Sequence, residues 1–187
     1  MEEEVQLYLD DAIEKMEKAV SHLEEELGRV RAGKASTALL DGINVDYYGS
    51  MTPLAQVSNI NTPDGRTIAV QPWEKTMIDP IEKAILAANI GLTPVNNGEM
   101  IRINIPILTE ERRKDLVKQI RGMGENTKVS IRSARRDAND AFKQMKKDGL
   151  SEDQEKDAEA KVQEVTNKFS EMADKLIEIK EKDIMTV

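Results

Sequence analysis

The 187-residue sequence has no cysteine, few aromatic residues and no long apolar run. Without cysteine it can form no disulfide framework, thiolate metal site or thiol nucleophile, which suits a reducing compartment. No segment approaches the roughly 18 to 20 apolar residues that span a bilayer. The first residues are acidic, whereas a signal peptide begins with a basic and then an apolar region. We therefore expect a soluble, cytoplasmic protein with no membrane partner.

Motifs for catalysis and cofactor binding are also missing. The sequence contains no phosphate-binding G-x-x-x-x-G-K-[ST], no G-x-G-x-x-G after a strand and no spaced set of histidines and cysteines. The only histidine, His22, lies among acidic residues without a nucleophile pattern, which favours a solvated side chain over a catalytic base. Gly122 and Gly124 lie within a helical pattern and indicate local packing or flexibility. We expect no enzymatic activity, no cofactor and no metal.

Three long segments have apolar residues spaced by three and four, as in helices that are buried along one stripe. The first covers residues 3–31 and is predicted to end at Gly33. The second, Thr109–Lys147, begins with a capping threonine and two acids. The third begins at a capping box formed by Ser151 and Gln154. With 33% charged and 3% aromatic residues, this pattern predicts an elongated three-helix bundle.

Each helix has a predicted buried seam. In the first it comprises Val5, Leu9, Ala12, Met16, Ala19, Leu23, Leu27 and Val30. In the second it comprises Leu116, Ile120, Met123, Thr127, Ile131, Ala134, Ala138, Ala141 and Met145. In the third it comprises Ala158, Val162, Val165, Phe169, Met172, Leu176 and Ile179.

Between the first two helices the pattern changes to short alternating segments and turns. The predicted elements are strands at 43–48, 57–62, 67–71 and 100–105, turns at 49–53 and 62–65, and a helix at 81–89 capped by Asp79 and Pro80. The fold class is therefore α+β. An inserted β/α/β domain covers residues 32–106, and a bundle domain is formed by residues 1–31 and 107–187.

Two connecting segments join these domains, one at Gly33-Lys34 and one at Ile105-Pro106. Glycine on one side and proline on the other are compatible with a hinge. A rigid, packed boundary is the alternative, and the sequence leaves both open.

The net charge of −8 is unevenly distributed. Residues 1–27 carry ten acids and two bases, and residues 151–187 carry eleven acids and six bases. Residues 109–148 instead carry twelve bases and seven acids. This segregation can attract a phosphate backbone to one element. The alternative is that the basic helix neutralises its two acidic neighbours.

The cations of the second helix form a stripe beside its apolar seam. Its members are Lys114, Arg121, Lys128, Arg132, Arg135, Lys143 and Lys146, with Arg136 adjacent. Arginine can bind phosphate oxygens with two parallel hydrogen bonds. Because few aromatics interleave with these cations, contacts to the backbone of folded RNA fit better than base stacking. A coiled-coil adaptor without an RNA partner is the rival hypothesis.

Several motifs, in this order and spacing, resemble the bacterial ribosome recycling factor family over essentially the whole chain. They are Arg31-Ala-Gly-Lys-Ala-Ser36, Leu40-Asp-Gly-Ile43, Tyr47-Tyr48-Gly49, Leu108-Thr-Glu-Glu-Arg-Arg-Lys-Asp-Leu116 and Arg135-Arg-Asp-Ala-Asn-Asp140. The resemblance implies an L-shaped, two-domain monomer that binds the post-termination ribosome. It also implies that the protein, with elongation factor G and GTP hydrolysis by that partner, splits the subunits and releases mRNA and tRNA.

The resemblance also assigns residues. Arg31, Arg113, Arg132, Arg135 and Arg136 match the arginines of the family that are implicated in contacting large-subunit rRNA, and we add Arg121 and Lys128 from the stripe. Gly33 and Pro106 match the family's hinge, to which we add Lys34 and Ile105. Lys34 stands where the family more often has arginine, so the charge remains but the two-pronged donor is lost.

Overall fold

The computed structural model describes residues 1–186 and shows two compact units. The first comprises residues 1–30 together with the chain from Glu110 onward, and the second comprises Arg31–Thr109. The first unit is helical and the second contains the sheets, which confirms the predicted α+β class of a three-helix bundle plus a small β domain. The second unit begins one residue earlier, and ends three residues later, than the predicted inserted domain.

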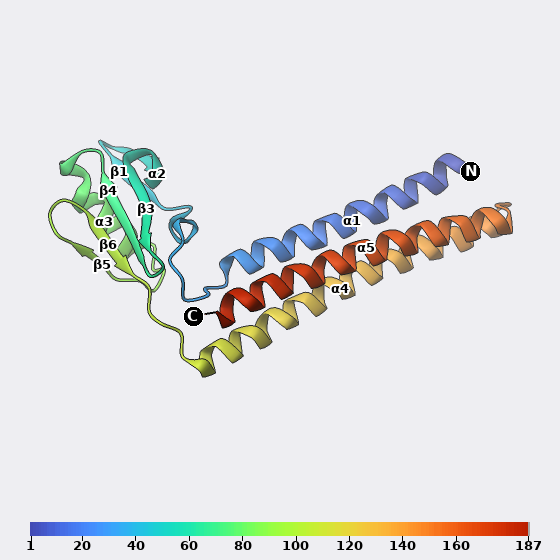
Figure 1. Ribbon diagram of the computed structural model, residues 1–187. Coiled ribbons are helices and arrows are strands. Elements are labelled where there is room, and N and C mark those ends of the chain that lie inside the picture. Colours follow the sequence, from blue (N-terminus) through green and yellow to red (C-terminus); the bar gives the residue numbers. More distant parts are fainter. Residues whose placement is uncertain (187) are drawn as a thin grey trace. The chain divides into compact units, whose positions relative to one another are not determined.

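The bundle consists of three long helices that lie side by side (Figure 1). They are α1 (Glu2–Arg29), α4 (Glu110–Lys147) and α5 (Glu152–Met185). Helices α4 and α5 are joined by a short turn, in which Gly149 has a φ of +113°. The predicted capping box is present at the start of α5, where the Ser151 hydroxyl accepts a hydrogen bond from the Gln154 amide at 3.2 Å. The capping of this helix was therefore predicted from sequence.

The buried seams follow the prediction in part. On α4 the predicted Met123 and Ala141 are half-buried, and the other predicted positions are buried. The prediction omitted three further buried residues, Val117, Gly124 and Phe142. On α1, Val20 is buried more fully than the predicted Ala19. On α5 the predicted Met172 and Ile179 are wrong, because both are exposed. The small residues Thr166 and Ala173 are buried instead, since close helix contact leaves less room there for long side chains.

Gly124 is one of these close contacts. A Cβ atom on this residue would lie 2.8 Å from Cγ1 of Ile177 on α5, whereas nothing lies within 4 Å of such an atom on Gly122. The packing role predicted for the glycine pair therefore applies to Gly124 alone.

The first helix ends four residues before Gly33. Val30 has an extended conformation (φ −77°, ψ 120°), and its amide donates to the Leu27 carbonyl at 3.1 Å. Gly33 has the left-handed conformation expected of it (φ +71°), but it serves the connecting segment. Val30, and not Gly33, is therefore the residue at which α1 ends.

The second unit contains two antiparallel sheets. Strands β1 (Asn44–Tyr47) and β2 (Ser50–Pro53) form a hairpin around Tyr48-Gly49, both with positive φ as a two-residue type I′ turn requires. The larger sheet has the order β3-β4-β6-β5 and contains β3 (Ser58–Asp64), β4 (Thr67–Pro72), β6 (Ile101–Asn104) and β5 (Pro94–Asn96). Short helices α2 (Leu54–Val57) and α3 (Ile78–Ala87) complete the unit with two 3₁₀ turns at Thr37–Leu40 and Lys75–Met77.

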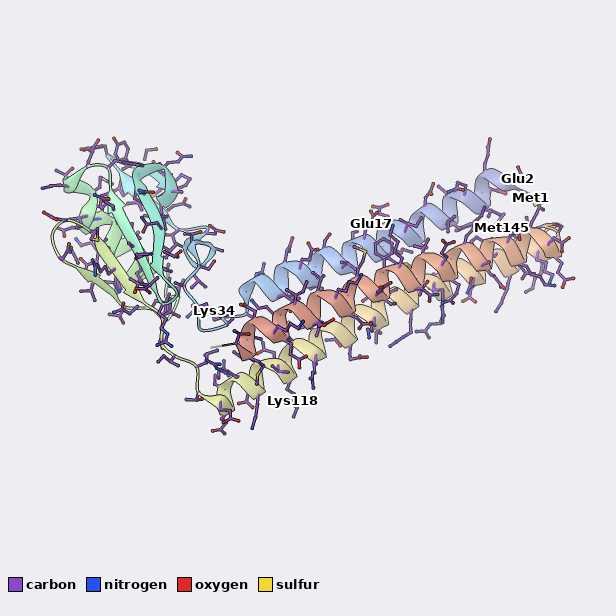
Figure 2. The ribbon with its side chains drawn as sticks, viewed as in Figure 1. Met1, Glu2, Glu17, Lys34, Lys118 and Met145 are labelled. Atoms are coloured by element: carbon purple, nitrogen blue, oxygen red, sulfur yellow. The ribbon has the colours of Figure 1, made fainter. Side chains whose placement is uncertain are left out.

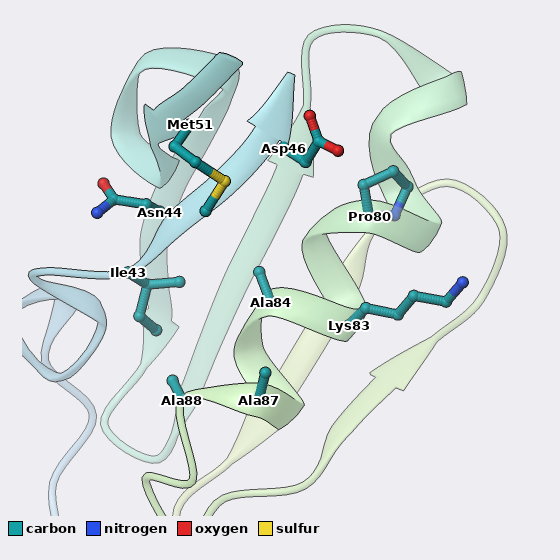
Figure 3. Close-up of a pocket in the computed structure, with 9 residues that line it drawn as sticks. All are labelled: Ile43, Asn44, Asp46, Met51, Pro80, Lys83, Ala84, Ala87 and Ala88. Carbon is teal, nitrogen blue, oxygen red and sulfur yellow. The ribbon is translucent and has the colours of Figure 1, made fainter. Parts of the chain in front are cut away.

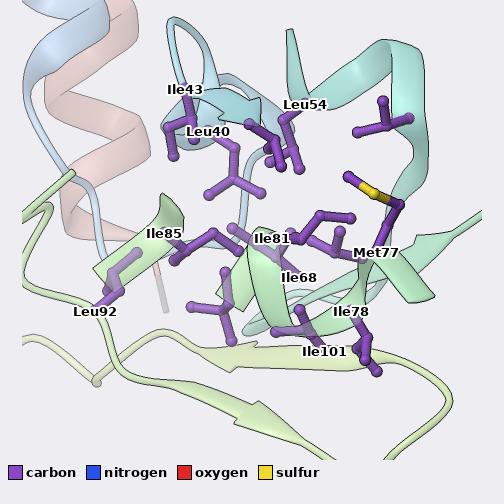
Figure 4. Close-up of a cluster of buried hydrophobic side chains, with 14 of the residues drawn as sticks. Leu40, Ile43, Leu54, Ile68, Met77, Ile78, Ile81, Ile85, Leu92 and Ile101 are labelled. Carbon is purple, nitrogen blue, oxygen red and sulfur yellow. The ribbon is translucent and has the colours of Figure 1, made fainter. Parts of the chain in front are cut away.

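One apolar cluster holds this unit together (Figure 4). It joins the inner faces of β4 and β6 to α3 and the hairpin, and includes Leu40, Val45, Leu54, Ile68, Val70, Ile81, Ile85, Ile101 and Ile103. The strict alternation of β6 is confirmed, since Ile101 and Ile103 are buried and the residues after each are exposed. The unit therefore has a core of its own, separate from the bundle.

Several predicted boundaries in this unit were wrong. Residues 50–53 pair as a strand rather than forming a turn, and the turn after β3 falls at Gly65-Arg66. Helix α3 begins at Ile78, so Asp79 and Pro80 lie within its first turn, where amide groups have no helical partner and proline is tolerated. Strand β5 and helix α2 were not predicted, because three or four residues carry too little periodicity.

Candidate nucleic-acid interface

The cations on this side of α4 form two rows. They include Lys118 in addition to the predicted stripe and leave out Lys114, whose Nζ lies 3.2 Å from Glu110 in the first turn. We call Arg121, Lys128, Arg135 and Lys146 the inner row, and Lys118, Arg132, Arg136 and Lys143 the outer row. At 100° per residue the members of each row fall within about 40° of one another, and the rows lie about 65° apart around the helix. The inner row lies closer to the buried seam, and the outer row is exposed.

The inner row bonds to α5 over most of its length. Arg121 pairs with Glu181, its Nε donating at 3.3 Å, and Lys128 Nζ lies 2.5 Å from Asp174. Arg135 donates to the Gln163 side chain at 2.9 Å. The partners occur in reverse order along the antiparallel helix. Arg121 and Lys128 therefore neutralise acids of the third helix, whereas the partner of Arg135 is a neutral amide. These contacts support, for α5, the alternative that the basic helix neutralises its acidic neighbours.

Lys146 completes the inner row with an ion pair to a buried carboxylate. Its Nζ lies 2.6 Å from Glu155, whose side chain is only 9% exposed. The hydrogen bond to Glu155 raises the pKa of Lys146 above its ordinary value of 10.5. Lys146 therefore contributes to the helix contact and not only to the solvated surface, because Glu155 is the one acid of α5 that lies in the packed helix face.

The outer row has a different environment. Arg132 and Arg136 are exposed, and among residues 1–186 neither has a hydrogen-bonding or ion-pairing partner. The same holds for Lys118 and Lys143, and Figure 2 labels Lys118 on this helix. These four cations are available to an anion from outside, because no internal carboxylate neutralises them.

The remaining predicted site residues lie elsewhere. Arg113 is half-buried near the start of α4 and donates to the Met185 carbonyl at 3.4 Å. Arg31 is exposed and belongs to the second unit, where its guanidinium lies beside Gly91. Asn139, which follows Arg135 by one turn, bonds to no arginine, and its buried Oδ1 has no partner among the described residues. The structure thus places Arg132 and Arg136 one turn apart on α4, whereas Arg31 belongs to the second unit.

The four predicted hinge residues all lie in the second unit. Ile105 is buried in the apolar cluster, and its amide donates to the Arg66 carbonyl at 2.7 Å. Gly33 packs on Leu108, since a Cβ on Gly33 would lie 2.8 Å from Leu108 Cγ. Pro106 is exposed and Lys34 is half-buried. Ile105 is therefore anchored in the core, while Gly33, Lys34 and Pro106 lie in the segments that lead out of it.

An open groove of about 640 Å³ lies between the hairpin and α3 in the second unit (Figure 3). Its lining is mainly apolar, with Ile43, Met51, Pro80 and three alanines, and it holds one acid and one base, Asp46 and Lys83.

Residues 1–186 contain no His, Asp and Glu cluster suited to a metal ion and no helix apolar and long enough to cross a membrane. His22 is exposed and lies 3.2 Å from Glu26.

Sequence reasoning missed the division of the stripe into two rows. The heptad spacing of Arg121, Lys128 and Arg135 was a usable signal, because such positions flank a helix–helix seam. The acids that pair with them were not identifiable, since α5 offers eleven acids from residue 151 onward and only the packing register selects among them.

The fold and these charged rows define a class of protein: a helical bundle with a small β unit, whose distinctive chemistry lies on an exposed helix face. The ribosome recycling factor family model matches residues 23–185. The chain belongs to the ribosome recycling factor family, whose members are non-enzymatic translation factors.

Curated relatives and solved structures agree with this assignment. The ribosome-recycling factor of Phocaeicola vulgatus is 56% identical over 179 residues, with 96% of each chain covered. That of Flavobacterium johnsoniae is 52% identical over 187 residues, with 100% of each chain covered. A solution structure of a ribosome recycling factor has a TM-score of 0.83 at 38% identity and covers 98% of each chain. The Thermus thermophilus factor in a model with elongation factor G on the Escherichia coli post-termination complex is 43% identical, has a TM-score of 0.64, and covers 97% of this chain and 99% of that chain.

Proposed function

We propose that this protein recycles bacterial ribosomes by binding large-subunit rRNA through the outer row of α4. With elongation factor G and GTP, it then separates the subunits and frees mRNA and tRNA. Its similarity to the T. thermophilus factor placed with elongation factor G on the post-termination complex supports this assignment. We expect this activity in the bacterial cytoplasm, because the curated relatives are ribosome-recycling factors of bacteria.

The main support for the RNA contact is the contrast between the paired inner row and the unpaired outer row of α4. The chain has a net charge of −8, yet Arg132 and Arg136 remain exposed and unpaired among the described residues one turn apart. A phosphate backbone provides the negative partner that the protein itself does not supply. Arginine suits this role because its planar guanidinium binds two phosphate oxygens at once. Arg121 and Lys128 contribute less in this proposal, since carboxylates of α5 already pair with them. Arg135 also contributes less, because it is half-buried and donates to the Gln163 side chain.

Salt dependence tests this contact. Co-sedimentation of the protein with purified large subunits, measured over a range of KCl concentrations, gives an apparent affinity at each salt. If three to five phosphates are neutralised, the slope of log affinity against log salt is about −3 to −5. A slope near zero contradicts the proposal and indicates contacts with ribosomal proteins instead.

We propose further that the segments around Gly33-Lys34 and Pro106 form a hinge, with Ile105 as its anchor in the second unit. A mobile second unit would let elongation factor G displace one part of the protein while the bundle stays bound to rRNA. The positive φ of Gly33 supports this role, because a glycine changes backbone conformation at low cost.

A reversible crosslink tests the hinge. Gly33→Cys combined with Leu108→Cys introduces the only thiols of the chain at positions that lie in contact. The oxidised variant is expected to bind large subunits but to lose subunit splitting with elongation factor G and GTP, measured by light scattering. The reduced form of the same variant is the control for strain at position 33. If the oxidised form splits the ribosomal subunits at full rate, movement between the two connecting segments is not part of the mechanism.

A further inference from the structure

Half of the aromatic residues of this chain gather at one place in the second unit. The sequence has one tryptophan, three tyrosines and two phenylalanines, and Tyr47, Tyr48 and Trp73 lie around the end of the β1–β2 hairpin. Tyr48 is 74% exposed and Trp73 is 68% exposed. Tyr47 is half-buried against the apolar cluster, so Tyr48 and Trp73 provide the exposed aromatic surface. Large exposed aromatic side chains grouped on a surface are typical of binding sites.

Tyr47 and Trp73 line a small pocket together with Glu74, and Tyr48 reaches it through a hydrogen bond to Glu74. The pocket has a volume of about 230 Å³, and its lining includes Tyr47, Trp73 and Glu74. Tyr47 donates to Oε1 of Glu74 at 3.0 Å, and Tyr48 donates to Oε2 at 2.8 Å. The tyrosine rings meet edge to face with centroids 4.7 Å apart. Two hydroxyls therefore hold one carboxylate in a defined position beside aromatic surface.

The chemistry of this tyrosine–glutamate pocket suits a cation. Each carboxylate oxygen has a second lone pair that the tyrosines leave unused. Aromatic faces attract ammonium and guanidinium groups, most strongly for tryptophan. The hydrogen bond to Glu74 raises the pKa of Tyr47, so this hydroxyl stays protonated and continues to donate at neutral pH.

We infer that the tyrosine–glutamate pocket binds a lysine or arginine side chain from a basic protein segment. This inference concerns the second unit and does not depend on the rRNA contact proposed for α4. Charge complementarity favours a protein cation over a stacked nucleobase, because Glu74 repels the phosphates that accompany a base. Residues 31–109 carry seven acids and six bases, so the unit has no positive field to offset that repulsion.

The only tryptophan of the chain reports on this pocket directly. We would titrate the protein with acetylated, amidated hexa-arginine and follow the emission of Trp73. A saturable change is expected, whereas the hexa-citrulline peptide, which lacks the charge, is expected to produce none. An equal response to the citrulline peptide contradicts the inference.

Matched variants locate the contact. Glu74→Gln is expected to weaken hexa-arginine binding about tenfold, since it removes the charge at the pocket. Glu99→Gln removes the same charge from another exposed acid of this unit and is expected to leave the affinity within about twofold. Equal losses in the two variants contradict a specific site.

Two measurements on the unaltered protein complete the test. Hexa-arginine is expected to shift the aromatic NMR signals of Tyr47, Tyr48 and Trp73 before those of Tyr8. Oligouridylate is expected to leave the three signals unchanged. Shifts produced by oligouridylate and not by hexa-arginine overturn the inference and make the pocket a nucleobase site.

Discussion

The inner and outer rows of α4 contain the same kinds of side chain and differ in what lies opposite them. Arg121, Lys128 and Lys146 each face a carboxylate of α5, so their charge helps to hold the bundle. Arg132 and Arg136 face solvent and have no internal partner in the described chain. A cation-rich helix can thus serve packing and binding at once, with a rotation of about 65° separating the two roles.

The largest effect is expected from the outer row. Arg132→Ala combined with Arg136→Ala should weaken large-subunit binding about a hundredfold, because each charge-assisted contact contributes about 1.5 kcal/mol or more. The melting temperature should change little. Arg121→Ala combined with Lys128→Ala is the control, since it removes the same charge from the inner row. Equal losses of binding in both double variants would remove the distinction between the rows.

A stability effect is expected from Lys146. Lys146→Met leaves the buried Glu155 without its cation and should lower the melting temperature by several degrees, whereas Lys143→Met in the outer row should not. The pKa of Lys146 is raised in the folded state, so its contribution is complete below pH 10.5 and is lost as the pH rises through the folded value. Urea unfolding at several pH values should show the difference from the unaltered protein narrowing above that point.

Alanine substitutions at two glycines test the difference between the packed side and the open side of α4. Gly122→Ala should stabilise the protein by about 0.5–1 kcal/mol, because alanine favours helix and no atom lies near the added methyl group. Gly124→Ala should destabilise it by about 1 kcal/mol or more, because the methyl group meets Ile177 at 2.8 Å. Urea unfolding measures both, and a gain in stability at Gly124 would show that the α4–α5 contact yields easily.

The smallest effect is expected at the end of the outer row. Lys143→Ala should weaken large-subunit binding by about threefold or less, since a single lysine supplies a point charge in place of a two-pronged donor. Co-sedimentation at low salt measures it. A loss as large as that of the arginine variants would extend the contact by about two turns of α4 from Arg136.

Periodicity and capping predicted much of the fold. Apolar spacing located all three long helices, and Ser151 with Gln154 marked the start of α5. Alternation identified β6 through Ile101 and Ile103. Short elements were missed where pairing between strands determines the structure. Residues 50–53 were predicted to form a turn, because only their hydrogen bonds to β1 make them a strand.

The sequence by itself determined the class of this protein and the helix that carries its positive charge. Apolar spacing and charge are properties of the chain, so they can be read without coordinates. Only the tertiary structure decided which cations are free, because this depends on the register between α4 and α5. That register places Lys146 against Glu155 and leaves Arg132 and Arg136 in solvent. Only the folded hairpin brings Tyr47 and Tyr48 to Glu74, which lies 27 and 26 residues further along the chain, respectively.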